Sequence, residues 1–179
     1  MSRSRCVVLV PVARHVEPAC EDGLRELERR GYPVRRVYGY SQIDVARSQM
    51  ATDALADGFD ELMWVDADML FHPDDVDRVR AHDRPLVAGV YAKKGRAEMA
   101  CAFLPGTEAV VLGEGGGLVE VLYAGFGFAL TRRSLYMRIA EGLRLPVCNA
   151  RFGKPLVPYF APTAADDGGG WWYLSLIHI

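Results

Sequence analysis

The first part of the chain alternates between short apolar runs and longer mixed segments, a pattern that predicts strands and helices in turn. The run from Val7 to Val10 is apolar and mostly β-branched, which is typical of a strand buried on both faces of a sheet. From Pro18 onward, Ala19, Leu24 and Leu27 share one face while the charged residues between them stay outside, as in an amphipathic helix. The chain therefore opens with a strand and a helix that covers it.

The same order continues through the next sixty residues. Apolar spacing and Gly or Pro boundaries predict further strands over residues 34–38, 59–65 and 86–91, and helices over 43–55 and 73–80. Strands that alternate with helices in this way build a mostly parallel sheet flanked by helices. The predicted fold class is α/β.

After residue 94 the pattern changes, and short strands follow one another across glycine-rich turns. These strands are predicted over 99–104, 109–112, 118–123 and 126–130, before a helix over 134–140. A mixed or antiparallel part is expected here. Residues 145–170 carry four prolines and three consecutive glycines, which favours a long loop, and the apolar end "WWYLSLIHI" either docks as a last strand or is truncated or foreign sequence.

Composition narrows the class of protein. A chain of 179 residues that is 50% hydrophobic suits one domain with a sizeable core, here over residues 1–175, and residues 176–179 are expected to be a non-native or truncated tail. A net charge of −2 without a basic block gives no support to nucleic-acid binding. The longest apolar run is too short for a membrane span and no signal peptide is recognised, so a cytoplasmic protein is expected. The four cysteines are scattered, which favours reduced, mostly buried thiols over a zinc or disulfide framework.

The stretch "ELMWVDADMLFHPDD" ends a predicted strand with two carboxylates, Asp66 and Asp68. On an extended backbone these two side chains project to the same side, and ligands of open α/β sheets bind at the carboxyl ends of strands. Close carboxylates repel each other unless a cation lies between them, and hard oxygen ligands favour Mg²⁺ or Mn²⁺. The alternative is a solvated acidic loop in which one Asp caps the next helix.

Four blocks give this motif a context: "PVARHVEPACEDGLRELERRGYPV", "QIDVARSQMATDALADGFDELMWVDADMLFHPDDV", "LVAGVYAKK" and "YAGFGFALTRRSLY". In order and spacing they resemble a bacterial, family-two-like nucleotide-sugar glycosyltransferase of the GT-A fold, over most of residues 6–175. The resemblance implies a Rossmann-like domain that moves a sugar from a nucleoside-diphosphate sugar to an acceptor hydroxyl. The acceptor, a glycan, lipid or protein, is not indicated.

The resemblance also implies roles for single residues. Asp66 and Asp68 would hold Mn²⁺ or Mg²⁺ at the donor diphosphate, with Asp68 in direct contact and Asp66 shared between metal and nucleotide. The remaining nucleotide-sugar positions are Pro11, Val12, Arg14, Arg47, Lys93, Gly125 and Gly127.

Each of these positions also has a structural interpretation. Arg14 and Arg47 would be surface arginines, and Lys93 and Lys94 solvated residues after a strand. Gly125 and Gly127 would form a tight strand bend. Ser48 stands where the family commonly has Asn, which weakens the transfer of that contact. His72, beside the acidic pair, is expected to start the following helix rather than to bind a metal.

The catalytic base of the family is not found. An acidic pair is expected shortly after "WWYLS", but the chain ends after four more residues. Asp166 and Asp167 are weak substitutes, since their loop favours a solvated turn. Trp171 and Trp172 would stack on a sugar or cap the core. The alternative function is a nucleotide-sugar-binding domain without transfer activity. A dehalogenase-type phosphohydrolase is disfavoured, because its D-x-D motif requires a Thr where Leu70 stands.

Overall fold

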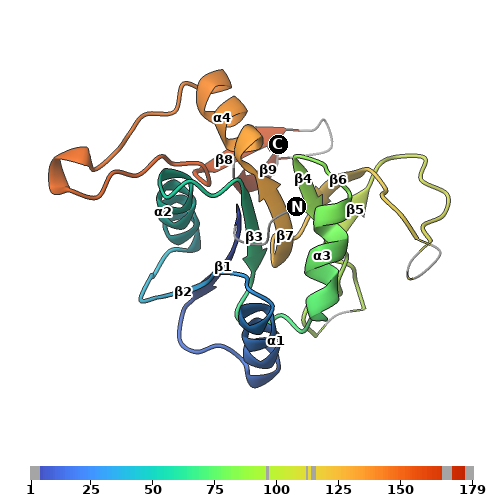
Figure 1. Ribbon diagram of the computed structural model, residues 1–179. Helices are drawn as coiled ribbons and strands as arrows, with labels where there is room; N and C mark the ends of the chain where they lie inside the picture. Colours follow the sequence, from blue (N-terminus) through green and yellow to red (C-terminus); the bar gives the residue numbers. More distant parts are fainter. Residues whose placement is uncertain (1–4, 96, 112, 114–115, 167–170, 176–179) are drawn as a thin grey trace.

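The computed structural model describes residues 5–95, 97–111, 113, 116–166 and 171–175. Its helices and strands, shown in Figure 1, follow the order β1 (Cys6–Val12), α1 (Pro18–Arg29), β2 (Val34–Tyr38), α2 (Ile43–Ala56), β3 (Glu61–Val65), α3 (Pro73–Ala81), β4 (Leu86–Ala88), β5 (Cys101–Phe103), β6 (Val121–Ala124), β7 (Phe128–Arg132), α4 (Arg133–Gly142), a 3-10 turn (Ala150–Phe152), β8 (Pro162–Asp166) and β9 (Trp171–Ser175). This confirms the predicted mixed α/β class.

The central sheet has five strands in the order β2-β1-β3-β7-β4. β1 pairs in parallel with β2 and β3, whereas β7 is antiparallel to both β3 and β4, so four strands run one way and β7 runs the other. The sheet is therefore mostly parallel, as predicted. The pairs β5-β6 and β8-β9 form separate two-stranded antiparallel sheets, which confirms the antiparallel character expected after residue 94.

Helices cover both faces of this sheet. In Figure 1, α1 and α3 lie on one side of the strands and α2 and α4 on the other. Because side chains alternate along a strand, β1 sends Val8 and Val10 into the core under α1 and α3 and sends Val7 and Leu9 into the core under α2 and α4. The continuous apolar run of β1 is thus explained by burial on both faces.

Pro11 lies inside β1 rather than just after it. The amide of Val8 donates toward the β2 side, to the Pro33 carbonyl at 2.8 Å, so by alternation the Pro11 nitrogen faces β3. Pairing of β1 with β3 ends at Leu9, two residues earlier. Pro11 is tolerated in a central strand because no ladder hydrogen bond is required of it on that side.

Several boundaries differ from the sequence prediction. β4 ends at Ala88 instead of Tyr91, and the strand expected over 109–112 is absent from 109–111, the part of it that is described. The loop predicted over 145–170 instead contains β8, which pairs with β9. In α1, Ala19 is exposed and Cys20 takes the inward position. The composition of these segments predicted turns and loops. Their actual structure depends on pairing between strands that are distant in the sequence.

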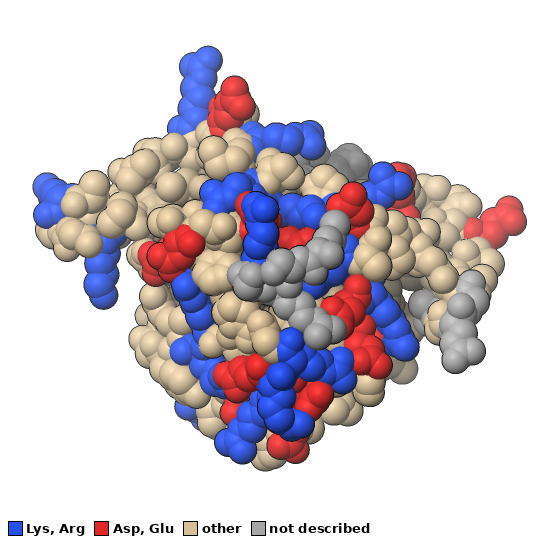
Figure 2. All heavy atoms as spheres, viewed as in Figure 1, with Lys and Arg blue, Asp and Glu red and all other residues tan. Residues whose placement is uncertain are grey.

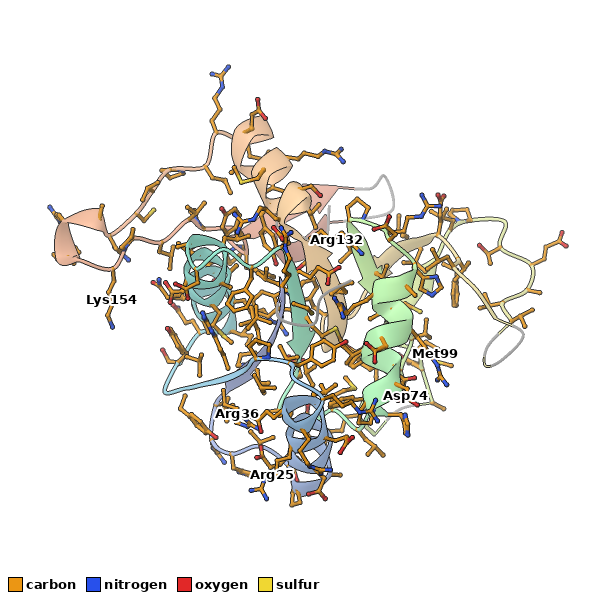
Figure 3. The ribbon with its side chains drawn as sticks, in the orientation of Figure 1. Arg25, Arg36, Asp74, Met99, Arg132 and Lys154 are labelled. Atoms are coloured by element: carbon orange, nitrogen blue, oxygen red, sulfur yellow. The ribbon has the colours of Figure 1, made fainter. Side chains whose placement is uncertain are left out.

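No described helix combines the length and apolarity that a membrane crossing requires. On the face seen in Figure 2, acidic and basic side chains alternate over α1 and α3. Arg36, labelled in Figure 3, is typical of this surface, because its guanidinium binds both Glu21 and Glu28 of α1. Local pairing of opposite charges accounts for much of this face.

The cysteines give a first testable prediction. Burial raises the pKa of Cys6 from 9.0 to about 12 and that of Cys20 to about 11, whereas Cys101 and Cys148 are partly exposed. Thiolates are the reactive form, so at pH 8 a disulfide reagent such as dithiobis(nitrobenzoate) should modify Cys101 and Cys148 in the native protein and all four cysteines only after unfolding.

The same shift makes stability depend on alkaline pH. The folded chain retains the Cys6 proton more tightly than the unfolded chain, so this contribution is complete below pH 9 and is lost as the pH rises toward 12. Urea titrations of wild type and Cys6→Ala between pH 8 and 10.5 measure it. Rapid labelling of all four thiols in the folded protein would contradict the burial on which both expectations depend.

Candidate functional site

The D-x-D residues lie in a turn at the carboxyl end of β3. β3 ends at Val65, and the amide of Met69 donates to the Asp66 carbonyl at 3.0 Å, which closes a turn over Asp66 to Met69. The assumption that Asp66 and Asp68 share a side because their backbone is extended is therefore wrong. The turn itself is fixed, since the Asp66 amide donates to the Gly127 carbonyl and the Glu17 amide to the Ala67 carbonyl, both at 2.8 Å.

Arg47 of α2 binds the first carboxylate. Its Nη2 donates to Asp66 Oδ1 at 2.7 Å, and its guanidinium lies over the Phe126 ring, 5.2 Å from the centroid. The Arg47 side chain is only 12% exposed, and its Nε is buried without a hydrogen-bond partner among the described residues. A buried donor without a partner is costly, so Arg47 retains unused capacity to bind an anionic or carbonyl group.

Asp68 is the more accessible carboxylate, with a side chain that is 53% exposed. Lys94 Nζ lies 3.4 Å from Asp68 Oδ2, and the lysine is itself 85% exposed. A pair of this kind contributes little to stability and separates easily. Lys93, the predicted donor-binding lysine, instead forms an ion pair with Glu98 at 3.2 Å. Lys94 is therefore the lysine that the structure places beside the acidic turn.

Tyr91 was missed by the sequence analysis and lies at the centre of this region. Its hydroxyl accepts a hydrogen bond from the Gly127 amide at 2.8 Å. Burial raises the pKa of Tyr91, and the nearby charges of Asp66 and Asp68 raise it further. The sequence could have indicated Tyr91, because it follows β4 at the same edge of the sheet as Asp66. The phenol stays protonated, which leaves its own O–H able to donate.

Gly125 and Gly127 are explained by the same tyrosine. A Cβ built on Gly125 would stand 2.3 Å from the Tyr91 hydroxyl, and one on Gly127 would stand 2.7 Å from that hydroxyl and 3.1 Å from Asp66 Oδ2. The glycines thus make room for Tyr91 and Asp66. The strand-bend interpretation is thus incomplete, and the sugar contact of Gly125 and Gly127 stays a prediction.

The predicted nucleoside loop lies at the same edge of the sheet. Pro11 and Val12 are the last residues of β1 and are buried, and Arg14 follows in a bend with an exposed side chain. Because β1 and β3 are parallel neighbours, this bend and the acidic turn both leave the carboxyl ends of their strands. Among the described residues, no hydrogen bond or ion pair joins Arg14 to Asp66 or Asp68.

His72 has a structural role, as predicted. Its Nδ1 accepts from the Asp74 amide at 3.3 Å, and the Asp75 carboxylate accepts from the His72 amide at 3.1 Å, which forms a capping box at the start of α3. The hydrogen bond from Arg30 lowers the pKa of Asp74. These groups stabilise a helix end and are separate from the acidic turn.

Asp166 is not in the predicted turn, because it is the last residue of β8 and pairs in register with Trp171. Asp167, and the tail 176–179, lie outside the described residues. Trp171 and Trp172 belong to β9, so the backbone of this apolar end does form a strand, although with β8 and not with the central sheet. The catalytic role considered for Asp166 and Asp167 stays a prediction.

The acidic turn offers carboxylate oxygens, which are suitable ligands for a divalent ion. No group of three or more His, Cys, Asp or Glu side chains that could hold a metal occurs among the described residues. Mg²⁺, however, is commonly bound through one or two carboxylates together with water and substrate phosphates. The described hydrogen bonds use Asp66 Oδ1 and Asp68 Oδ2, so each carboxylate has a second oxygen to offer.

A cavity of about 340 Å³ adjoins this turn and is lined by Met69, Tyr91 and Phe128 among other residues. Neither Asp66 nor Asp68 lines this cavity, so the accessible part of the acidic turn is the half-exposed carboxylate of Asp68. The turn therefore presents the Asp68 carboxylate to solvent beside Lys94, whereas the Asp66 carboxylate is held by the partly buried Arg47.

Comparison with known proteins supports the fold alone. No family model and no curated protein matches the chain. Among solved structures it is similar to A197 from STIV, with a TM-score of 0.54 over 75% of this chain and 68% of that chain, at 18% sequence identity. At this identity the likeness concerns the arrangement of helices and strands, here a mostly parallel five-stranded sheet flanked by helices.

Proposed function

We propose that this chain binds a nucleoside-diphosphate sugar at the acidic turn and transfers the sugar to an acceptor hydroxyl. The observation that carries the proposal is the pair Asp66 and Asp68, which lie on a fixed turn at the carboxyl end of β3 with a cation beside each of them. Open α/β sheets bind ligands at this edge.

The proposal gives each residue a physical task. A divalent ion bound by Asp66 and Asp68 would supply Lewis-acid stabilisation to a diphosphate leaving group. Arg47 fixes the orientation of the Asp66 carboxylate through its 2.7 Å hydrogen bond, and its buried Nε can bind a donor oxygen. Lys94 can leave Asp68 and bind a phosphate oxygen, because both side chains are exposed.

The GT-A form of the α/β fold is part of this proposal. Four strands in one direction, helices on both faces and an acidic turn after β3 support it. Such a fold would place the nucleoside along the bend that follows β1, beside Pro11, Val12 and Arg14. Lys93 would then lie at the rim of the site, next to Lys94.

A second candidate function is binding of the nucleotide sugar without transfer. It is favoured because the described residues form no group of three or more His, Cys, Asp or Glu side chains that could hold a metal, and none of them is assigned as the base that transfer to a hydroxyl requires. Nucleotide binding and turnover therefore have to be measured separately. Release of UDP or GDP from the sugar nucleotide in the presence of Mn²⁺ distinguishes the two candidates.

Asp68→Asn tests the proposed anchor. We expect UDP and GDP to bind the wild type only with Mn²⁺ or Mg²⁺, and the substitution to weaken this binding about 10- to 100-fold, since a charged ligand contributes ~1.5–3 kcal/mol. Isothermal titration calorimetry of the full chain, with metal and with a chelator, measures both effects.

Asp57→Asn is the matched control. The Asp57 side chain is 54% exposed, against 53% for Asp68, and it too forms an ion pair, with Arg35 at 2.7 Å. It should leave nucleotide binding unchanged. Metal-independent binding, or equal effects of the two substitutions, would overturn the anchor.

A further inference from the structure

A second cleft, separate from the acidic turn, lies between β2, α2 and the loop around the 3-10 turn. It has a volume of about 820 Å³ and is lined by Tyr38, Tyr40 and Phe152 together with amide, carboxylate and ammonium groups. Tyr38 is 57% exposed and Phe152 is 69% exposed. The Arg151 guanidinium lies over the Phe152 ring, 4.6 Å from its centroid, but three aromatic side chains that line one cleft still offer apolar surface to a ligand.

The loop that forms one wall is held firmly on α2. The Val157 amide donates to Thr52 Oγ1 at 3.0 Å, and the Phe160 amide donates to Ser48 Oγ at 3.1 Å. A pair of backbone hydrogen bonds between Cys148 and Leu156, at 2.8 and 3.0 Å, closes the base of the loop. Ser48, which replaces the expected Asn, thus anchors this wall.

The tip of the loop presents Phe152 through an unusual backbone. Asn149 has φ 58° and Gly153 has φ 76°, both in the left-handed region, on either side of the 3-10 turn. Asn and Gly are the residues that adopt this conformation at least cost. In Figure 3 the loop projects away from the body of the protein, with Lys154 extending from it beside α2. These two positions shape the turn on which Phe152 is 69% exposed.

Polar groups on the α2 wall are already oriented. Gln49 Nε2 donates to Asp53 Oδ1 at 2.8 Å and to the Pro155 carbonyl at 3.1 Å. These bonds use both hydrogens of the amide, so the Gln49 oxygen and the second Asp53 oxygen remain as acceptors. Fixed acceptors next to aromatic faces suit a ligand with an apolar C–H face and hydroxyl groups at its edge, which describes a pyranose ring.

We propose that this cleft binds the saccharide portion of the acceptor, an inference that rests on the sugar transfer proposed above. Tyr38 ends β2, and one strand, β1, separates β2 from β3. Neighbouring strands are ~4.8 Å apart, so the cleft begins about 10 Å from the acidic turn, along the same edge of the sheet. A saccharide with its inner ring stacked on Tyr38 or Phe152 would extend along this edge toward the acidic turn, on the solvent side of the nucleoside proposed beside the bend after β1.

Saturation-transfer NMR on the full chain tests this proposal, with maltose, cellobiose, lactose and diacetylchitobiose as probes and without metal or nucleotide. We expect ring C–H protons of at least one disaccharide to receive saturation. Phe152→Ala and Tyr38→Ala should each weaken its apparent affinity about tenfold, as expected for loss of a stacking partner. Circular dichroism spectra identical to wild type show that each variant is folded.

Met137→Ala is the control, because Met137 is 54% exposed on α4 and does not line the cleft. Absence of binding by all four disaccharides, or binding that survives both aromatic substitutions, would overturn the proposal. Displacement of the sugar by uridine would also overturn it, since the cleft would then hold a base. The metal-dependent binding of UDP is measured independently, so the saccharide cleft can fail while the acidic turn stands.

Discussion

Arg80→Met should lower the free energy of unfolding by about 3–5 kcal/mol, the cost of leaving one partner of a buried ion pair alone. Arg80 and Glu61 have side chains that are each only 6% exposed, and Arg80 Nε and Nη2 both lie 2.7 Å from Glu61 Oε2. Methionine keeps the length and packing of the stem but removes the charge. Urea unfolding at pH 7, followed by circular dichroism, measures the change.

The surroundings of this pair set the size of the effect. Arg132, labelled at the end of β7 in Figure 3, still binds Glu61 Oε1 at 3.0 Å, so the loss should fall near the lower end of the range. Arg80 Nη1 also donates to the Tyr32 hydroxyl at 2.9 Å. Burial raises the pKa of Tyr32 to about 12, so this phenol remains neutral and adds no negative charge beside Glu61 when Arg80 is lost.

Two further variants make the expectation specific. Arg78→Met removes an exposed arginine of the same helix, whose pair with Asp75 should contribute less than about 1 kcal/mol. The double variant Arg80→Met/Glu61→Leu removes both charges and should be more stable than Arg80→Met alone. Equal losses for Arg78→Met and Arg80→Met would show that the buried pair is not a stabilising element.

Gly127→Ala should destabilise the protein by about 1–3 kcal/mol, the usual cost of forcing extra volume into a packed position. The new Cβ would meet the Tyr91 hydroxyl and the Met69 methyl at 2.7 Å and Asp66 Oδ2 at 3.1 Å. The backbone cannot easily retreat, because the Gly127 carbonyl accepts from the Asp66 amide at 2.8 Å. Thermal or urea unfolding measures the loss.

Tyr91→Phe tests whether the steric clash between the new Cβ at position 127 and the Tyr91 hydroxyl causes the loss of stability. Alone it removes the acceptor of the Gly127 amide and should cost about 1 kcal/mol. In the double variant the phenylalanine no longer brings an oxygen against the new Cβ, so the combined loss should be smaller than the sum of the two single losses. Additive losses would mean that Gly127 does not make room for Tyr91.

These two predictions concern opposite ends of β3. Glu61 begins the strand inside a buried charge network, and Asp66 follows its last residue beside Arg47 and Tyr91. The strand between them is buried along its whole length, with Trp64 donating to Thr131 Oγ1 at 3.0 Å and to the Tyr136 hydroxyl at 3.1 Å. A rigid strand held at both ends keeps the acidic turn in one place.

The local pattern of apolar and polar residues was sufficient to predict most of the helices and strands near the start of the chain. Apolar residues together with local boundary residues such as Gly58 predicted the positions of β2 and α2 within one or two residues, because turn residues end an element locally. The same reasoning placed Asp66 and Asp68 after a buried strand. It also identified His72 as a helix cap, since a capping box is made within four residues.

Contacts between distant residues were decided by the tertiary structure. The antiparallel insertion of β7 between β3 and β4, the pairing of β8 with β9 and the bond between Arg47 and Asp66 join segments whose proximity no local period records. Tyr91 is the clearest case, because its place above Gly125 and Gly127 depends on where two separate strands end. The sequence alone thus determined most elements up to β4 and the position of the two carboxylates after β3, whereas packing determined the later strand pairs and which cation, hydroxyl and glycine surround the carboxylates.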